Sequence, residues 1–556
     1  MFVDVTTYGA NPNGLVDATT AFQNADAAAG TLYVPVGTYK LSGPSFAISS
    51  DIRFEQGAVL KPDASVTIEL NGSLDAGLFQ IFDVSASGSH VYPRRGTEVF
   101  PQWWGAKGDW LNDDYPAIAA ALDAVRVTGS VAGTGATVCF PKGIYRVTHP
   151  LDCTIGAYHL KGAGPQLSIL RGDTGPGRAV IEFLGSAFCT VEGLQIDTTG
   201  VSGLGTPPTG TPTASPSTVG VLLGRVTAAD TGQPNQSWYV NLRECFINLQ
   251  GNMDANGSHG TVGVYNYGCE VSNLHDVMVA ADVPVLYTNT NVFSLTSYHR
   301  PSGGSLPMIN VSTSMTVVTA TGGNAFFAIG GPALQVAGAA NVHVSAHLAS
   351  RGSHPAAIEI SGTVTDFEHR GTIEVFPRVL RTISVLRGAR LFSTMMNYSS
   401  GNPLIYLAPD PANQSQPQIL DSIIHIIPSS DAYAGGSPLV DQVYVIDTDA
   451  SAAALVEGSL LFLNRGKARI SNAFPASGFN GNLVLSDQNL ASLTITSGNR
   501  TGNSVKAADG FEVDGPKLGL GTTATGSTLG SVVRKVQVYD AAGTSLGYIA
   551  VYNSIT

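Results

Sequence analysis

Short apolar segments separated by Gly, Asn, Asp and Thr make up most of the chain from Cys153 onward. Three of them share one frame, in which two residues and then one residue separate apolar positions: Val191–Ile196, Leu242–Ile247 and Leu274–Val279. Two polar residues between apolar ones fit a tight bend between two strands of one coil, with the apolar side chains pointing inward. The second and third frames lie 32 residues apart, which corresponds to about one coil. Because neighbouring coils stack at about 4.8 Å, residues 150 to 400 or beyond would form about ten coils, roughly 50 Å of solenoid.

Polar, proline-rich stretches interrupt this pattern. Gly200–Pro216 is dense in Thr, Pro and Gly, so we interpret it as a loop extruded from the coils. Gly251–Gly260 and His299–Pro307 are further candidates for such loops. Pro409–Pro417 indicates a boundary, although strand-like runs continue beyond it, and Gly515–Gly530 has the composition of a linker.

The chain ends in a hairpin pattern. Two alternating segments, Val533–Asp540 and Gly547–Tyr552, flank the turn residues Ala541–Gly543. A lone hairpin is hardly stable in water, so we expect this one to pair with another element.

The stretch Pro101–Gly164 predicts the beginning of the solenoid. It contains Gly105-Ala106-Lys107-Gly108-Asp109, then Asp113 and Asp114, and then an Ala-rich run that predicts a helix over Pro116–Val125. Pro116 suits the opening position, and Asp113 or Asp114 would cap the first turn. The residues Ala117, Ile118, Ala121 and Leu122 share one helix face. Strands punctuated by Gly follow directly.

Residues 1–100 repeat this arrangement in shortened form. Asp17 follows Gly9 by eight residues, as Asp113 follows Gly105, and each Asp precedes an Ala-rich helix, here Ala18–Ala29. We therefore expect four regions: an N-terminal module (1–100), a parallel β-helix with a helix cap (101–405), a β-rich region or continued coils (406–514), and a linker with the terminal hairpin (515–556). The segment Val91–Gln102 would join the first two.

The stretch 101–200 resembles the pectate-lyase-like superfamily as it occurs in bacteriophage tailspikes, where Gly-Ala-Lys-Gly-Asp, Asp-Asp and a short helix mark the β-helix entrance. The resemblance implies an all-β fold, a right-handed parallel β-helix whose helix covers the open end, with a β-structured C-terminal trimerisation region. Family members usually carry Gly where Trp110 stands, and we expect this departure to matter little. Alternatively, Asp109, Asp113 and Asp114 could bind Ca²⁺. We expect no cofactor.

Composition and charge narrow the function. Only 13% of residues are charged and 64 of 556 are Gly, and a net charge of −12 argues against nucleic acid or an anionic membrane as partner. No apolar run reaches the length of a membrane span, so we expect no membrane insertion, and the N-terminus lacks the basic start of a signal peptide. The five widely spaced cysteines have no zinc or redox spacing and predict buried free thiols: Cys139, Cys153, Cys189, Cys245 and Cys269.

Stacking logic identifies a first pair of candidate catalytic residues. Glu244 and Asp276 occupy the same position of successive frames, and Arg243 and His275 stand beside them as candidate substrate-binding residues. Glycoside hydrolysis needs two carboxyl groups, about 5 Å apart in retaining enzymes and about 6.5–9.5 Å apart in inverting ones, and adjacent coils provide such spacings. The alternative is that these are ordinary bend residues forming a polar ladder.

A second group of candidates lies further along the chain. Glu359 and Glu374 are flanked by apolar residues, so alternation turns them outward as candidate catalytic carboxylates. They could equally be exposed strand charges. Asp366 and Glu368 belong to the same cluster as candidate substrate-binding residues. His343 and His347 alternate with buried positions of a strand and would lie about 13 Å apart, too far to share one metal ion.

The remaining candidates for contact with sugar are Arg351, Tyr265 and Tyr267. The two tyrosines lie on one strand face and could stack on sugar rings or pack between protomers.

The resemblance implies a homotrimeric phage tailspike in the virion, associated with other tail proteins and acting outside the cell on a bacterial surface polysaccharide, a capsule or an O-antigen. Two carboxylates favour hydrolysis by a glycosidase. Elimination by a lyase would need a base such as His275 or His347 and a cation such as Arg243 or Arg351. A non-catalytic glycan-binding adhesin is the third possibility.

Overall fold

The computed structural model describes residues 1–126, 135–175, 177–198, 217–226, 235–249, 261–266, 269, 271–281, 283–288, 292–296, 298–300, 309–312, 317–328, 332–350, 356–374, 376–396, 402–409, 416–428, 443–449, 454–463, 468–470, 479–485, 493–495, 532–539 and 545–552. The chain divides into two compact units, Met1–Gly498 and Asn499–Thr556. Tyr267, Arg351 and nearly all residues of the expected loops and linker lie outside the described residues.

The first module consists of three small parallel sheets, with the strand orders β1-β3-β6-β9, β2-β4-β7 and β10-β8-β5. Its strands are β1 (Phe2–Asp4), β2 (Asn13–Asp17), β3 (Thr31–Val34), β4 (Gly37–Leu41), β5 (Phe46–Ile48), β6 (Ile52–Phe54), β7 (Ala58–Pro62), β8 (Thr67–Leu70), β9 (Leu74–Asp75) and β10 (His90–Pro93). It also contains the 3₁₀ helix η1 (Val5–Tyr8) and the helix α1 (Thr19–Asp26), which is shorter at both ends than its Ala-rich pattern predicts.

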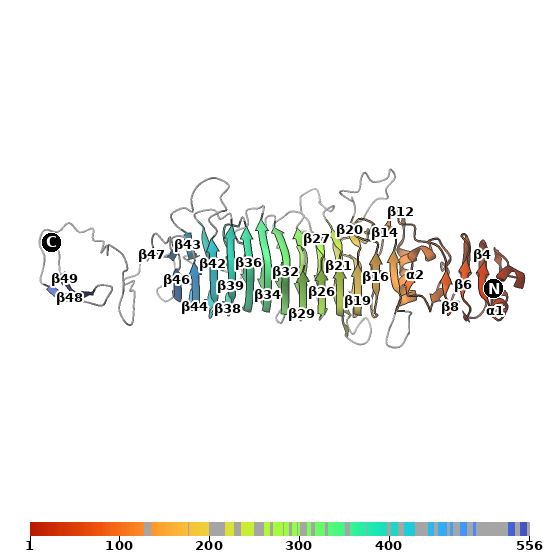
Figure 1. The fold of residues 1–556 in the computed structure, drawn as a ribbon, viewed down its shortest axis with the longest axis horizontal. Coiled ribbons are helices and arrows are strands. Elements are labelled where there is room, and N and C mark those ends of the chain that lie inside the picture. Colours follow the sequence, from red (N-terminus) through yellow and green to blue (C-terminus); the bar gives the residue numbers. More distant parts are fainter. Residues whose placement is uncertain are drawn as a thin grey trace. The chain divides into compact units, whose positions relative to one another are not determined.

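Two long sheets form the rest of the first unit, and Figure 1 shows their strands following one another in chain order. Within the residues that the structure describes, the larger sheet has 23 strands. They are β11 (Glu98–Val99), β12 (Asp109–Asp113), β13 (Thr137–Phe140), β14 (Gly143–Val147), β16 (His159–Gly162), β17 (Ser168–Gly172), β19 (Ala187–Glu192), β20 (Gln195–Thr198), β23 (Trp238–Arg243), β24 (Phe246–Asn248), β26 (Val271–His275), β27 (Met278–Ala280), β29 (Val292–Thr296), β30 (Tyr298–Arg300), β32 (Val317–Ala328), β34 (Ala340–Ser350), β36 (Val364–Glu374), β38 (Val385–Arg387), β39 (Arg390–Met396), β41 (Gln418–Leu420), β42 (Ile423–Pro428), β44 (Leu455–Leu463) and β46 (Phe479–Leu485).

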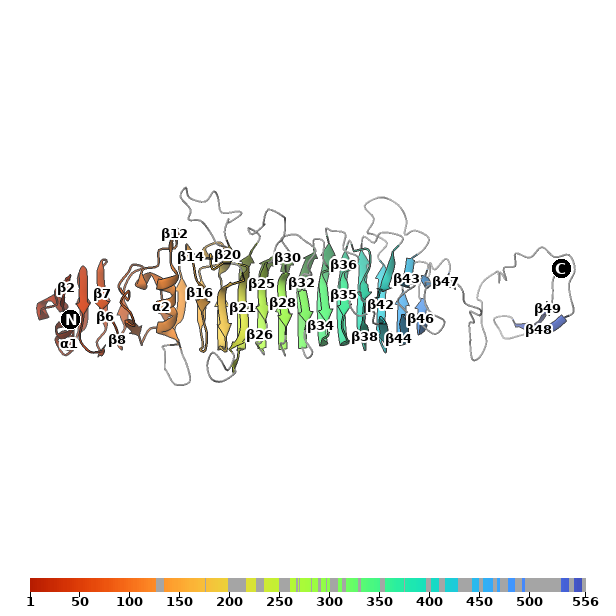
Figure 2. The same cartoon turned by 180° about the vertical axis from the view of Figure 1, so that it is seen from behind.

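The described part of the chain contributes 14 strands to the smaller sheet, and Figure 2 labels β25, β28 and β35 among them. They are β15 (Leu151–Asp152), β18 (Ala179–Leu184), β21 (Val219–Val226), β22 (Asn235–Gln236), β25 (Val262–Asn266), β28 (Val283–Thr288), β31 (Ile309–Ser312), β33 (Leu334–Ala337), β35 (Ile358–Ser361), β37 (Leu380–Thr382), β40 (Pro403–Leu407), β43 (Val443–Thr448), β45 (Ala468–Ile470) and β47 (Leu493–Ile495). The chain alternates between the two sheets, and equivalent strands of successive coils pair in parallel, while β22 pairs antiparallel with β21. This is the parallel β-helix that the sequence predicts, and its coils continue past residue 405 as far as β47.

The core is built from columns of apolar side chains. Leu160, Val191, Leu242 and Leu274 are register partners on successive coils, and each is at most 1% exposed. The frames behave as predicted, because the residues between the apolar positions form bends on the left-handed backbone: Gly193, Glu244 and Asp276 have φ values of 63°, 50° and 53°. The interval of 32 residues between the second and third frames is one coil, since Asn273 donates to Asn241 across it.

The entrance helix α2 covers Tyr115–Val125, one residue more than predicted, and buries the expected face. It packs against β10, β13 and β15, together with the 3₁₀ helix η2 (Pro101–Trp104). Asp113 accepts the N–H of Tyr115, whereas Asp114 turns back to accept the N–H groups of Lys107 and Gly108. Asp113 is therefore the capping side chain, and Asp114 holds the preceding loop.

The Trp110 departure matters, contrary to the sequence-based expectation. Trp110 has φ of +72°, a conformation that suits Gly, and its side chain is 5% exposed beneath the guanidinium of Arg171 at 4.9 Å.

The cysteines are free: Cys153, Cys189, Cys245 and Cys269 are buried, and Cys139 is partly exposed. In the second unit, the described strands β48 (Val532–Tyr539) and β49 (Ser545–Tyr552) form the predicted antiparallel hairpin.

Candidate functional site

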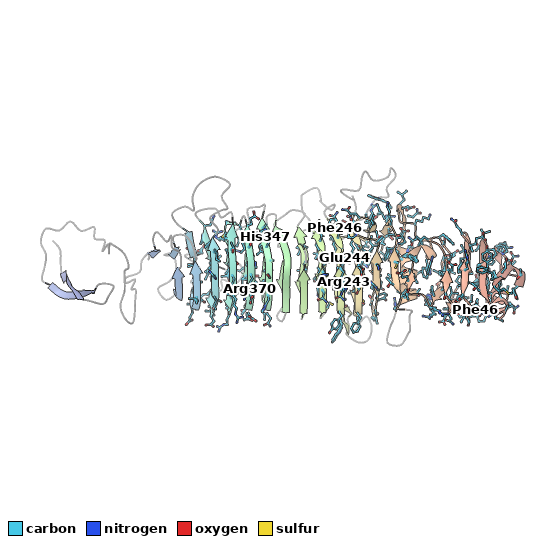
Figure 3. The ribbon with its side chains drawn as sticks, viewed as in Figure 1. Phe46, Arg243, Glu244, Phe246, His347 and Arg370 are labelled. Carbon is cyan, nitrogen blue, oxygen red and sulfur yellow. The ribbon has the colours of Figure 1, made fainter. Side chains whose placement is uncertain are left out.

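The outward face of the 23-stranded sheet carries two groups of candidate residues at separate places along the coils, and Figure 3 labels members of both. We call the first the corner group: Arg243, Glu244, His275 and Asp276. We call the second the histidine–carboxylate group: His343, His347, Asp366, Glu368 and Glu374. Four register steps, from Leu274 through Leu295, Ala320 and Val344 to His369, separate their coils. At about 4.8 Å per coil, the two groups lie about 19 Å apart.

The corner group lies where β23 and β26 end. Arg243 is the register partner of His275, so Glu244 and Asp276 occupy the same bend on adjacent coils, as stacking logic predicted. Nε2 of His275 lies 3.2 Å from Oδ2 of Asp276, and these side chains are 60% and 68% exposed. Asp is among the residues that tolerate a left-handed backbone, so the bend explains Asp276 in part without chemistry.

The histidine–carboxylate group is assembled from β34 and β36, which pair directly. His343 and His347 alternate with buried Val342, Val344 and Ala346, as the strand pattern predicted. Nε2 of His343 lies 3.4 Å from Oδ2 of Asp366, and His343 is the register partner of Glu368. Three candidate side chains thus meet on two adjacent coils.

A second contact in this group joins His347 and Glu374. Their Nε2 and Oε2 atoms lie 3.3 Å apart, and the side chains are 32% and 33% exposed. Glu374 follows Glu368 by six residues of strand, about 20 Å. Glu374 is therefore too far from Glu368 to act with it on one glycosidic bond.

Arg370, Phe392 and His425 extend the group, and sequence reasoning missed them. Arg370 forms an ion pair with Glu368 and lies over the ring of Phe392 at 4.8 Å. Phe392 contacts His425 edge-on at 6.2 Å. Arg370, Phe392 and His425 are register partners on three successive coils. Alternation in β36 would have turned Arg370 outward beside Glu368, but the other two partners depend on the register between coils.

His369 lies between these residues in sequence but belongs to the core. It is fully buried, and its Nδ1 lies 2.9 Å from Oγ of Ser393. Burial lowers the pKa of His369 to about 4. Its imidazole therefore stays neutral, and it takes no part in the outer face.

Glu359 and Tyr265 lie on the 14-stranded sheet, apart from the other candidates. Glu359 accepts hydrogen bonds from Gln335 at 3.1 Å and from Arg381 at 2.6 Å, and its side chain is 13% exposed. The prediction that Glu359 lies near Asp366, Glu368 and Glu374 is therefore wrong. Alternation correctly predicted that the side chain of Glu359 points outward. It does so from another sheet, where its hydrogen bonds link three coils.

The acidic entrance residues are occupied by N–H groups of the protein. Asp109 accepts from Leu111 and Asn112, and Asp114 is 1% exposed. Burial raises the pKa of Asp114 to about 6, against the hydrogen bonds from Lys107 and Gly108. Within the described ranges, no group of three His, Cys, Asp or Glu side chains has the geometry to hold a metal ion.

The described helices include none that is both long and apolar enough to cross a membrane.

No model of a known protein family matches this chain, and no curated protein matches it either. Several solved structures are similar. The A-module of the mannuronan C-5 epimerase AlgE4 from Azotobacter vinelandii shares 15% identity over 72% of this chain and 100% of that chain, with a TM-score of 0.45. Tailspike protein 2 of the Escherichia coli bacteriophage CAB120 shares 11% identity over 66% of this chain and 42% of that chain, with a TM-score of 0.38. The tailspike protein of the E. coli bacteriophage HK620 shares 12% identity over 86% of this chain and 78% of that chain, with a TM-score of 0.30.

Proposed function

We propose that this chain is a phage tailspike that binds and depolymerises a bacterial surface polysaccharide, a capsule or an O-antigen, by glycoside hydrolysis. The observation that carries the proposal is the histidine–carboxylate group, which places three carboxyl groups, each beside a histidine or Arg370, on the outer face of adjacent coils. A solenoid face of this kind suits a long ligand, because equivalent side chains recur at each coil along it.

Asp366 and Glu368 are the pair that we assign to the chemistry. They are two residues apart on β36, and because Asp366 forms a left-handed bend with φ of 52°, their Cα atoms are at most about 7 Å apart. Two side chains that extend from such positions can span the separation of about 6.5–9.5 Å between the carboxyl groups of inverting glycosidases. Glu368 is ion-paired with Arg370, which suits a base that works as a carboxylate and activates water. Asp366 would then protonate the leaving oxygen, and Nε2 of His343 lies 3.4 Å from its Oδ2 and would orient the carboxyl group.

The other members of the group would hold sugar units beside this pair. Phe392 is partly exposed and offers an apolar ring surface, and the His347–Glu374 pair offers hydrogen bonds about six residues further along the strand. The corner group is the competing location for catalysis, and a homotrimer with other tail proteins as partners is the assembly that we propose.

The test is incubation of the full chain with capsule or lipopolysaccharide, followed by sizing of the products. We expect shorter saturated oligosaccharides with new reducing ends, and a loss of about 10²-fold or more in Glu368→Gln and Asp366→Asn. Glu244→Gln is the matched control, an exposed carboxylate on the same sheet face that should keep full activity.

Each contrary outcome has a distinct meaning. Loss of activity in Glu244→Gln alone would move the site to the corner group. Products that absorb as a new C=C bond would indicate a lyase, in which His347 serves as base. Binding without shortening of the polysaccharide would leave a glycan-binding adhesin.

A further inference from the structure

A hollow in the first module lies apart from the face to which we assign hydrolysis. It has a volume of about 540 Å³, within the range of about 300–1,000 Å³ typical of small-molecule sites. Four successive strands of one sheet, β1, β3, β6 and β9, contribute to it, and Tyr33, Arg53 and Asp75 are register partners on the last three. Phe2 on β1 and Phe79 complete its aromatic lining.

The polar groups of the hollow contact one another and the aromatic lining. Nε of Arg53 lies 3.5 Å from Oδ2 of Asp75, and the guanidinium stands over the ring of Phe2 at 5.6 Å. The hydroxyl of Tyr33 donates to Glu55 at 2.8 Å, and Glu55 also accepts the N–H of Val36. The hydrogen bond to Glu55 raises the pKa of Tyr33, so its hydroxyl stays protonated at neutral pH.

The aromatic surface remains accessible although it is apolar. Phe2 is 60% exposed, and its ring meets that of Tyr33 edge-on at 6.2 Å. A pyranose ring combines a C–H face that packs on aromatic carbon with vicinal hydroxyl groups that match the paired atoms of a guanidinium or carboxylate. The hollow presents both kinds of surface within one space.

The net charge of the residues that line the hollow limits the chemical class of ligand that can bind there. One cation, Arg53, faces two carboxylates, Glu55 and Asp75, which gives a formal charge of −1 (+1 −2). This balance disfavours a uronate, sulfate or phosphate group. A purely apolar peptide would cover these charges without satisfying them, which costs several kcal/mol per ion.

We infer that this hollow is a second carbohydrate site that binds a neutral hexose or N-acetylhexosamine unit without cutting it. The inference does not depend on the proposed hydrolysis, because it uses other coils, another sheet and other residues. A site of this kind would hold the polysaccharide or a second surface glycan while the β-helix acts elsewhere.

The test is binding of the full chain to an array of immobilised oligosaccharides, with neutral hexose and N-acetylhexosamine oligomers beside uronate-containing ones. We expect retention on the neutral oligomers and at least a tenfold loss in Arg53→Ala and in the isosteric Asp75→Asn. Leu15→Ala, which changes a side chain that is 78% exposed elsewhere in the module, should bind as the parent does. All three variants should shorten polysaccharide as the parent does, and Glu368→Gln should keep this binding.

Three results would overturn the inference: retention of uronate-containing oligomers alone, no retention of any neutral oligomer, or unchanged retention by both Arg53→Ala and Asp75→Asn. A change of solution mass in Arg53→Ala with unchanged retention would identify a second copy of the chain as the occupant instead. If the polysaccharide assay fails while retention is lost in Arg53→Ala, only the proposed hydrolysis is wrong.

Discussion

The two entrance regions of this molecule are built on the same plan but differ in burial. The order β1, η1, β2, α1, β3, β4 in the first module recurs as β11, η2, β12, α2, β13, β14 at the start of the long β-helix. In both, β2 or β12 ends in an Asp whose register partner is basic, Lys40 in the first case and Arg146 in the second.

These basic residues begin a ladder of charged side chains in each region. Register and ion pairing define the first ladder as Lys40, Lys61, Asp63 and Asp83, and the second ladder as Arg146, Arg171, Asp173 and Asp197. The side chains of the first are 26–43% exposed. Those of Arg146, Arg171 and Asp173 are 14%, 1% and 1% exposed. The same arrangement of charges is thus in contact with solvent in the first module and buried at the start of the long β-helix.

Burial reverses the pKa shift of the equivalent aspartates. Burial raises the pKa of Asp197 to about 6, against hydrogen bonds from Gln195 and Thr198. At Asp83 burial also favours a higher pKa, but hydrogen bonds from Ser85 and Lys61 outweigh this effect, so the pKa of Asp83 is lowered. Exposure of the ladder to solvent, and not its pattern of charges, therefore decides whether the folded state favours the protonated or the ionised form of the aspartate.

Removal of the central carboxylate should give the largest contrast. In Asp173→Asn, Arg146 loses its partner at 2.6 Å and Arg171 its partner at 3.7 Å, so we expect a loss of about 3–5 kcal/mol. In Asp63→Asn, the exposed Lys40 loses its partner at 3.4 Å, which should cost at most about 1 kcal/mol. Hydrogen exchange of β14 and β17, compared with β4 and β7, measures both local stabilities. Equal losses would contradict the role given to burial.

The pH dependence of the two ladders should have opposite signs. The folded-state pKa of Asp197 lies above its unfolded value of 3.8, so the stability that it contributes is complete below about pH 4 and is lost as the pH rises through about 6. The loss is about 3 kcal/mol, and Asp197→Asn should abolish it.

The pKa of Asp83 is lowered, so its contribution is present above pH 3.8 and is lost as the pH falls. Because Asp114 titrates in the same window as Asp197, the measurement is local: hydrogen exchange of β20 for Asp197 and of β7 for Asp83. A parent β20 whose protection against exchange, corrected for the intrinsic pH dependence of amide exchange, is constant between pH 4 and 7 would count against the buried ladder.

The smallest effect concerns the residue that covers the second ladder. Gly14 and Trp110 occupy equivalent positions, five residues after Gly9 and Gly105, and both have φ of +72°. Gly14→Ala should cost about 1–2 kcal/mol, from the left-handed backbone and from a Cβ only 3.2 Å from Thr38.

Trp110→Gly relieves a similar strain but uncovers Arg171 and removes a buried aromatic ring, so we expect a net loss of about 1–2 kcal/mol. Urea unfolding of the two variants beside the parent checks both signs. A Trp110→Gly variant more stable than the parent would show that covering Arg171 contributes little.

Much of the fold could be predicted from particular residues. The frames gave the bends at Glu244 and Asp276 and the coil of 32 residues between them, and alternation gave the outward direction of His343 and His347. The candidate site could be predicted only in part. Glu359 faces outward as predicted, but it lies on the 14-stranded sheet and not on the sheet that carries Asp366, Glu368 and Glu374. Alternation distinguishes inside from outside but not one sheet from another.

The contacts of Phe392 with Arg370 and with His425 escaped prediction because coil lengths vary. Asn241 and Asn273 are 32 residues apart, Gln335 and Glu359 are 24 apart, and Glu359 and Arg381 are 22 apart. A register that changes from coil to coil cannot be extended by counting residues.

The sequence by itself determined the stacked parallel coils, the outward direction of side chains such as His343 and His347, and the bends at Gly193, Glu244 and Asp276, because pleating and left-handed turns depend on neighbouring residues. The tertiary structure decided which coils meet, and hence that His343, Asp366 and Glu368 share a surface. It also decided that Arg171 and Asp173 are buried while Lys61 and Asp63 remain in contact with water. Register and burial depend on the number of residues between a strand and its partner on the next coil. A local pattern of apolar and polar residues does not contain that number.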